Sequence, residues 1–142
     1  LFLDAEHGQY LEELGGMNIF IVFKDGSLAT PALSDSILAG VTRQSIIEIA
    51  RAEGRRVEER QIGLEEVRTG LASGEVTELF ACGTAAVIFP ISILKGLNFE
   101  YSSPNAGSAN VSLSLRQKLT DIQYGRVKNS SNWMRQLSSA HN

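Results

Sequence analysis

The chain has 142 residues, a length that suits one domain with a substantial buried core. Hydrophobic residues make up 43% and charged residues 20%, which is ordinary for a globular protein. With a net charge of −3, no basic block and only short apolar runs, the sequence indicates neither a nucleic-acid partner nor a membrane partner or span.

The first half of the chain predicts a β-hairpin followed by a helix. Residues 17–23 are β-branched and aromatic and predict a strand, and Asp25-Gly26 predicts the turn to a second strand that ends at Pro31. Residues 43–53 place isoleucines on one helical face, and Gly54 predicts the end of that helix.

The second half alternates strands with helices. Strands are predicted at 57–62, 78–82 and 85–93, helices at 64–71 and 111–124, and a loop at 102–109. Pro90 predicts that its strand lies at a sheet edge or contains a bulge, because proline cannot donate to a central ladder. This order of elements indicates an α/β or α+β fold.

Three short segments are candidates for binding a ligand: 12–18 (EELGGMN), 37–43 (ILAGVTR) and 81–86 (ACGTAA). In the first, two glycines permit close approach to the backbone, although solvated carboxylates are the commoner explanation of such a segment. In the second, a glycine-containing loop leads into a helix N-terminus that suits a phosphate, and the commoner alternative is that Thr42 caps its own helix. In the third, small side chains leave backbone amides uncovered for an anion, and the alternative is a tight turn with close packing. Cys82 within it is typical of a small buried hydrophobe rather than a nucleophile.

Together and in this order, the segments resemble the second half of the fold-type IV aminotransferases, which depend on pyridoxal 5'-phosphate (PLP). The resemblance is closest to the branched-chain amino-acid aminotransferases. Residues 12–20 resemble their Glu-x-Gly-x-Met-Asn-hydrophobic motif, 37–43 their Leu-Pro-Gly-Val-Thr-Arg loop, 82–86 their Ser/Cys-Gly-Thr-Ala motif, and 119–125 (LTDIQYG) a segment of their final helix. The resemblance runs from residue 1 to about 133 and implies an α/β domain with a strongly twisted, barrel-like sheet and flanking helices.

The resemblance also implies a cofactor site for PLP. Glu13 would keep the pyridine nitrogen protonated, which makes the ring an electron sink for the substrate Cα. The backbone N–H groups of Val41 and Thr42 would bind the phosphate, with the hydroxyls of Thr42 and Thr84 as further donors. No metal site is implied.

Substrate contacts follow from the same resemblance. The amides of Thr84 and Ala85 would take the substrate carboxylate, Met17 would line an apolar side-chain pocket, and Gly16 would leave room near the ring. The implied reaction moves an amino group between leucine, isoleucine or valine and 2-oxoglutarate, giving a branched 2-oxo acid and glutamate, in an enzyme that is a homodimer.

Two departures from the family pattern concern the loop and the catalytic lysine. Ala39 replaces the usual proline before Gly40, which loosens the loop slightly. The family's Schiff-base lysine lies well upstream of the Glu motif, whereas only twelve residues precede Glu13 here and none is lysine. Lysines 24, 95, 118 and 128 all come later, so the resemblance gives this chain no catalytic residue. The expectation is that residues 1–142, which begin with Leu rather than Met, are a C-terminal PLP-binding domain that lacks its N-terminal domain and is inactive alone.

Two rival functions remain open. Another fold-type IV enzyme, a D-amino-acid aminotransferase or a 4-amino-4-deoxychorismate lyase, is disfavoured by the Gly-Gly-Met-Asn and LTDIQYG segments. A non-catalytic domain that binds a phosphate ligand or serves as a structural partner is the other rival. The expected compartment is the cytoplasm, or the mitochondrion in a eukaryote.

Overall fold

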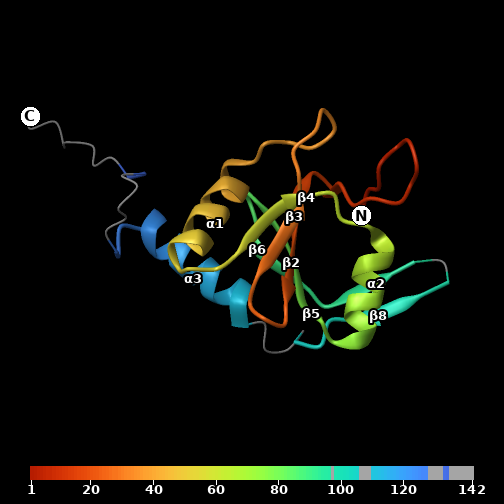
Figure 1. Ribbon diagram of the computed structural model, residues 1–142. Coiled ribbons are helices and arrows are strands. Elements are labelled where there is room, and N and C mark those ends of the chain that lie inside the picture. Colours follow the sequence, from red (N-terminus) through yellow and green to blue (C-terminus); the bar gives the residue numbers. More distant parts are fainter. Residues whose placement is uncertain (97, 106–109, 128–132, 135–142) are drawn as a thin grey trace, which may run out of the picture.

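The computed structural model describes residues 1–96, 98–105, 110–127 and 133–134 (Figure 1). Its elements, in chain order, are β1 (Glu13–Leu14), β2 (Met17–Phe23), β3 (Leu28–Pro31), α1 (Val41–Ala52), β4 (Val57–Arg60), α2 (Leu64–Ser73), β5 (Val76–Gly83), β6 (Val87–Ile91), β7 (Ile93–Lys95), β8 (Glu100–Ser102) and α3 (Asn110–Gln123). In the ranges described, no helix combines the length and the apolar character that crossing a bilayer requires.

Six strands form one mixed sheet. The strand order is β4-β3-β2-β5-β6, and β1 pairs with β2 outside this path. Only β3 and β4 are parallel, with α1 as the connection between them, and the other neighbours are antiparallel. The short hairpin β7-β8 forms a second sheet.

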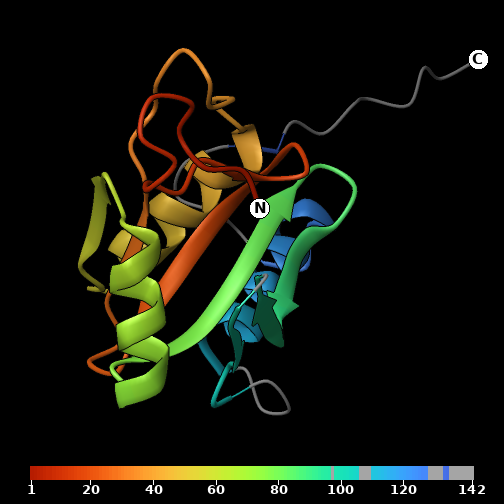
Figure 2. The ribbon, with the colours of Figure 1, turned by 90° about the vertical axis from the view of Figure 1, so that its right-hand side faces the viewer.

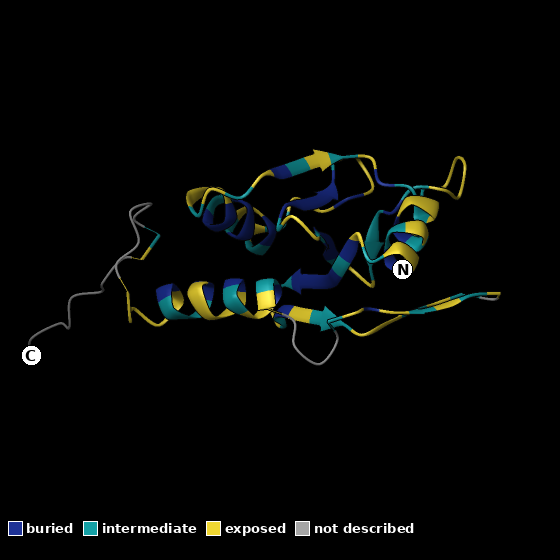
Figure 3. Ribbon diagram, turned by 60° about the horizontal axis from the view of Figure 1, so that its bottom comes forward, coloured by how far each residue is buried: buried dark blue, intermediate teal, exposed yellow. Residues whose placement is uncertain are grey.

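Both faces of the sheet are covered, which explains why β2 is apolar from Ile19 to Phe23. Phe20 and Val22 face α1 and α3, whereas Ile19 and Ile21 face α2 and the β7-β8 hairpin. Successive side chains of a strand point to opposite faces, so a strand buried on both faces reads as a continuous apolar run. Figure 3 shows the buried residues along the strands and on the inner sides of the helices.

The predicted hairpin and the three predicted helices are confirmed, with the helix limits within two residues of the predicted ones. β2 covers the predicted residues, and Asp25 Oδ1 accepts a hydrogen bond from the Ser27 N–H at 2.8 Å in the turn to β3. Gly54, which follows the C-cap residue Glu53 of α1, adopts a positive φ of 78°, as is typical of a helix stop. Pro90 lies in β6, at the end of the strand order, so the predicted edge position is also confirmed.

Several local predictions were wrong. Helix α1 begins at Val41 rather than residue 43, and its N-cap is Gly40, so Thr42 is not the capping residue. The predicted strand 85–93 divides into β6 and the start of β7, and β8 extends into the region predicted as a loop. On α3, Leu113 is 45% exposed although it is apolar, whereas Leu115 and Leu119 are buried.

The barrel-like closure expected from the resemblance is not found in the described part of the chain. The two ends of the strand order are β4 and β6, and no pairing joins them there. A barrel needs every strand to have two neighbours. The sheet is therefore open in the ranges described, with helices on both faces (Figure 2).

Glu78 in β5 explains how α3 is attached to the sheet. This carboxylate is 2% exposed, and it accepts hydrogen bonds from the N–H groups of Val111 and Ser112, each at 2.9 Å, and from the Ser112 hydroxyl at 2.7 Å. The first N–H groups of a helix lack internal partners and carry a partial positive charge. The buried carboxylate of Glu78 accepts hydrogen bonds from these N–H groups and also balances their partial positive charge.

Replacing Glu78 with Ala is therefore expected to destabilise the protein by about 3 kcal/mol, because one buried and one partly buried N–H group lose a charged acceptor. Urea unfolding followed by circular dichroism measures the change. Glu75→Ala, at an exposed position just before β5, is the matched control and is expected to change stability by less than about 0.5 kcal/mol. Equal effects of the two substitutions would contradict the role given to Glu78.

Candidate functional site

The three segments singled out in the sequence meet at one end of the sheet. Asn18, near the start of β2, pairs with Cys82, near the end of β5, so the β1-β2 turn and the turn after β5 lie beside each other. The loop from β3 into α1 leaves from the same end (Figure 2). The structure thus brings together residues that are more than sixty positions apart in the chain.

Glu13 lies in β1, opposite Asn18 of β2. Gly15 and Gly16 between them have φ values of 58° and 80°, a left-handed conformation that side chains other than glycine rarely adopt. A Cβ at Gly16 would meet no atom within 4 Å, so the conformation, rather than a neighbour within the described residues, requires glycine there. The Glu13 carboxylate is half-buried, and its Oε1 accepts a hydrogen bond from the Leu38 N–H at 2.7 Å.

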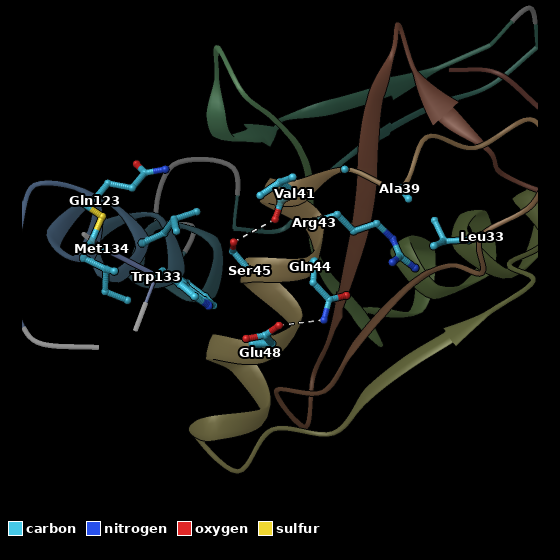
Figure 4. Close-up of a pocket in the computed structure, with 13 residues that line it drawn as sticks. Leu33, Ala39, Val41, Arg43, Gln44, Ser45, Glu48, Gln123, Trp133 and Met134 are labelled. Atoms are coloured by element: carbon cyan, nitrogen blue, oxygen red, sulfur yellow. Dashed lines mark hydrogen bonds between the residues drawn. The ribbon is translucent and has the colours of Figure 1, made fainter. Parts of the chain in front are cut away.

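The N-terminus of α1 carries backbone N–H groups that its own side chains do not cap. The N-cap is Gly40, which has no side chain, and the first turn contains no acidic residue. Val41 is 82% exposed and Thr42 is half-buried, so the amides expected to bind phosphate lie at the surface of the described structure. A cavity of about 660 Å³ borders this helix end, between α1 and α3, with Trp133 on its far side (Figure 4).

Arg43 anchors the same helix end to the sheet, a role that the sequence did not suggest. Its side chain is 2% exposed, and Nη2 donates to the Pro31 carbonyl at 2.9 Å and to Glu59 Oε2 at 3.0 Å. Figure 4 shows the guanidinium group directed away from Trp133. Arg43 therefore ties α1 to the ends of β3 and β4.

The third segment forms the turn between β5 and β6. Thr84 and Ala85 are exposed, and the register pairs Gly83 with Val87. Met17 packs against this turn, since a Cβ at Gly83 would lie 3.3 Å from Met17 Cγ. Val87 closes the turn with a φ of 57°, a conformation that costs a β-branched residue about 1–2 kcal/mol.

Cys82 is completely buried, and burial raises the pKa of its thiol to about 12. A thiol with that pKa is protonated at neutral pH and is a poor nucleophile. We expect Ellman's reagent at pH 8 to leave the native protein unmodified over minutes and to titrate one thiol per chain in denaturant. Prompt labelling of the native protein would contradict the buried placement.

A family model described as amino-transferase class IV matches residues 1–94. The chain belongs to this family. Its fold agrees with two class IV aminotransferase structures. The branched-chain amino acid aminotransferase of Escherichia coli superposes with a TM-score of 0.76 at 30% identity, covering 94% of this chain and 41% of that one. The T.th. branched-chain amino acid aminotransferase, solved with pyridoxamine 5'-phosphate, gives a TM-score of 0.77 at 28% identity, covering 94% and 39%.

Curated bacterial relatives include proteins named as branched-chain aminotransferases. This chain is 43% identical over 141 residues to a branched-chain-amino-acid aminotransferase of Mycolicibacterium smegmatis, covering 97% of this chain and 38% of the relative. It is 46% identical over 136 residues to branched-chain-amino-acid transaminase 1 of Bacillus subtilis, covering 94% and 37%. The chain therefore spans less than two-fifths of the length of these relatives.

Proposed function

We propose that this chain is the C-terminal, PLP-binding portion of a branched-chain amino-acid aminotransferase. The whole enzyme would exchange an amino group between leucine, isoleucine or valine and 2-oxoglutarate, as a homodimer. The observation that carries the proposal is the meeting, at one end of the sheet, of a carboxylate, an uncapped helix N-terminus and a turn with exposed small residues. The branched-chain names of the relatives support the substrate class.

The residues present fit the chemistry of PLP. A dianionic phosphate suits helix N-terminal amides that no side chain caps, as at Gly40. A pyridine nitrogen that must stay protonated suits a carboxylate held in place, and the Leu38 N–H holds Glu13 Oε1. When bound, PLP supplies an electron-withdrawing ring to the substrate carbon that bears the amino group.

In this proposal the chain's own residues bind and orient the cofactor and the substrate. The Glu13 carboxylate holds a proton on the ring nitrogen through a charge-assisted hydrogen bond. The amides of Val41 and Thr42 bind the phosphate, and the hydroxyls of Thr42 and Thr84 add donors. The amides of Thr84 and Ala85 fix the substrate carboxylate, and so decide which bond at the substrate carbon is presented to the ring.

The proposed site also needs a lysine from elsewhere in the enzyme. Lys24 lies in the turn between β2 and β3, at the far end of β2 from Met17. Lys95 pairs with Glu100 at 2.9 Å in the β7-β8 hairpin, and Lys118 in α3 pairs with Glu53. Lys128 falls outside the described residues. The proposal therefore places the catalytic lysine, and any barrel-like closure of the sheet, in a missing N-terminal portion and its contacts with this chain.

Substrate profiling of the full-length protein tests the proposal. With 2-oxoglutarate as acceptor, we expect leucine, isoleucine and valine all to be substrates, with kcat/KM values within about 200-fold of one another, because an apolar pocket separates substrates that differ by one methylene by only about 1–3 kcal/mol. A preference for D-alanine over leucine would overturn the substrate class. Phosphate binding without any transamination would favour a non-catalytic phosphate-binding domain.

A further inference from the structure

Asn18 occupies a position in the site to which the proposed function gives no role. It is 6% exposed, near the start of β2, and pairs with Glu13 on one side and with Cys82 on the other. Its side-chain amide leaves the strand and donates from Nδ2 to the Leu38 carbonyl at 2.9 Å. A buried side chain of the sheet thus holds the backbone of the loop before α1.

Leu38 is the residue at which three parts of the site meet. Its N–H donates to Glu13 Oε1 at 2.7 Å, and its carbonyl accepts from both Asn18 Nδ2 and the Gly40 N–H, the latter at 2.8 Å. Its side chain is 69% exposed, so hydrogen bonds rather than apolar packing hold this residue in place. The same peptide segment therefore links the carboxylate of β1 to the N-cap of α1.

Gly40 completes the arrangement through a steric contact. Its φ of −67° is accessible to any residue, so backbone conformation does not require glycine here. A Cβ at this position would instead overlap Asn18 Oδ1. The two atoms of the Asn18 amide thus have separate tasks: the nitrogen fixes Leu38, and the oxygen sets how closely Gly40 approaches the strand.

We propose that Asn18 is a positioning residue for the cofactor phosphate: it holds the Leu38–Gly40 segment so that the first amides of α1 lie at a fixed place relative to Glu13. This inference rests on the proposed function, because the phosphate is the group that those amides bind. Asn18 touches neither the phosphate nor the ring. Its effect passes through the loop backbone to the phosphate-binding amides at the start of α1.

Asn18→Asp tests the positioning role, because it removes the donor toward Leu38 with little change in side-chain shape. Ionised Asp at position 18 has nearly the shape of Asn but no N–H, so it turns a donor toward Leu38 into a charged oxygen facing another oxygen, and Gly40→Ala, described below, disturbs the same contact without adding a charge. The loop is then expected to shift away from the strand. Affinity for the phosphate moiety falls, whereas contacts to the rest of the cofactor change less.

The measurement compares two ligands in the full-length apoprotein. Dissociation constants are determined for PLP and for pyridoxal, which lacks the phosphate, and their ratio isolates the phosphate contribution. Asn18→Asp is expected to reduce the preference for PLP over pyridoxal by about tenfold, the effect of losing one well-placed hydrogen bond in the loop. An unchanged preference in a folded Asn18→Asp protein would overturn the inference.

Thr30→Val is the matched control. Thr30 is also buried, and its hydroxyl donates to the carbonyl of Ile19, the residue next to Asn18, at 2.8 Å. The substitution removes a comparable buried bond to the same strand without touching the loop. It is expected to lower thermal stability as Asn18→Asp does, yet to leave the ligand preference within about twofold of the wild type. A matching loss of preference in Thr30→Val would mean that only general stability is involved, and would overturn the inference.

Gly40→Ala tests the same contact without altering the buried position, should Asn18→Asp fail to fold. The added Cβ is expected to displace the loop and lower the PLP preference by a similar factor. In an Asn18→Ala background the overlap is gone, so the second substitution is expected to have a smaller effect than in the wild type. If the effects of Gly40→Ala and Asn18→Ala on the PLP preference were additive, the inferred contact between the two positions would be contradicted.

A wild-type protein with no preference for PLP over pyridoxal would overturn the proposed function and this inference together. A wild-type preference that survives both Asn18→Asp and Gly40→Ala would overturn the inference alone.

Discussion

Replacing Glu13 with Gln in the full-length protein is expected to leave PLP bound and to lower kcat by about 10²–10³-fold, the scale seen when one charge-stabilising contact is removed. Gln at position 13 retains an oxygen that can accept the Leu38 N–H, so the loop should stay in place. It carries no charge to keep the ring nitrogen protonated. Steady-state kinetics with leucine, together with the absorbance of bound cofactor, measures the two effects separately.

Glu12→Gln is the matched control for this substitution. Glu12 is the adjacent carboxylate, and its Oε1 accepts a hydrogen bond from the Ser36 hydroxyl at 2.6 Å rather than from the Leu38 amide. We expect little change in kcat for this variant. Glu13→Ala should differ again, because it removes the Leu38 anchor as well and should weaken cofactor binding. An unchanged kcat in Glu13→Gln would refute the role given to Glu13.

The isolated 142-residue chain is expected to show no transamination above background. It is also expected to form no specific borohydride-stable adduct with PLP, because no described lysine lies at the proposed site. The physical reason is proximity: a covalent step requires the amine within bonding reach of the cofactor carbonyl. Borohydride reduction in the presence of PLP, followed by peptide mass spectrometry, measures the outcome.

The product of the complete reading frame provides the positive comparison. If the N-terminal portion proposed above supplies the lysine, a full-length polypeptide that contains it should form one reduced adduct, upstream of Leu1. A single adduct on Lys24, Lys95 or Lys118 of the isolated chain would contradict the proposal directly. Scattered low-level labelling of several lysines would match non-specific reaction with PLP and would leave the prediction standing.

Local sequence patterns were sufficient for most of the secondary structure. The run at 17–23 and the Asp25-Gly26 turn predicted β2 and its hairpin, because β-branched residues and turn chemistry act over a few positions. They failed where a long-range contact decided the outcome. Ser112 is buried and Leu113 exposed on α3 because Glu78 of β5 binds the N–H and the hydroxyl of Ser112.

The candidate site shows the same division. Each of the three motifs, around Glu13, Gly40 and Thr84, is a short continuous stretch, so its residue types could be recognised in the sequence alone. The antiparallel pairing of β2 with β5 placed the first and third segments together, which no local pattern encodes. The Asn18–Leu38 hydrogen bond, the contact of Asn18 with Gly40 and the burial of Arg43 all join residues distant in the chain.

By itself the sequence determined the three helices, strands β2 to β5 and the three segments that resemble an aminotransferase site. The tertiary structure alone decided that the sheet is open in the described residues, that Gly40 rather than Thr42 is the N-cap of α1, and that Leu38 is held between Glu13 and Asn18. The reason is one of range. Propensity and turn chemistry act between neighbours in the chain, whereas closure of a sheet and the fit of a side chain against a distant glycine depend on how the elements pack.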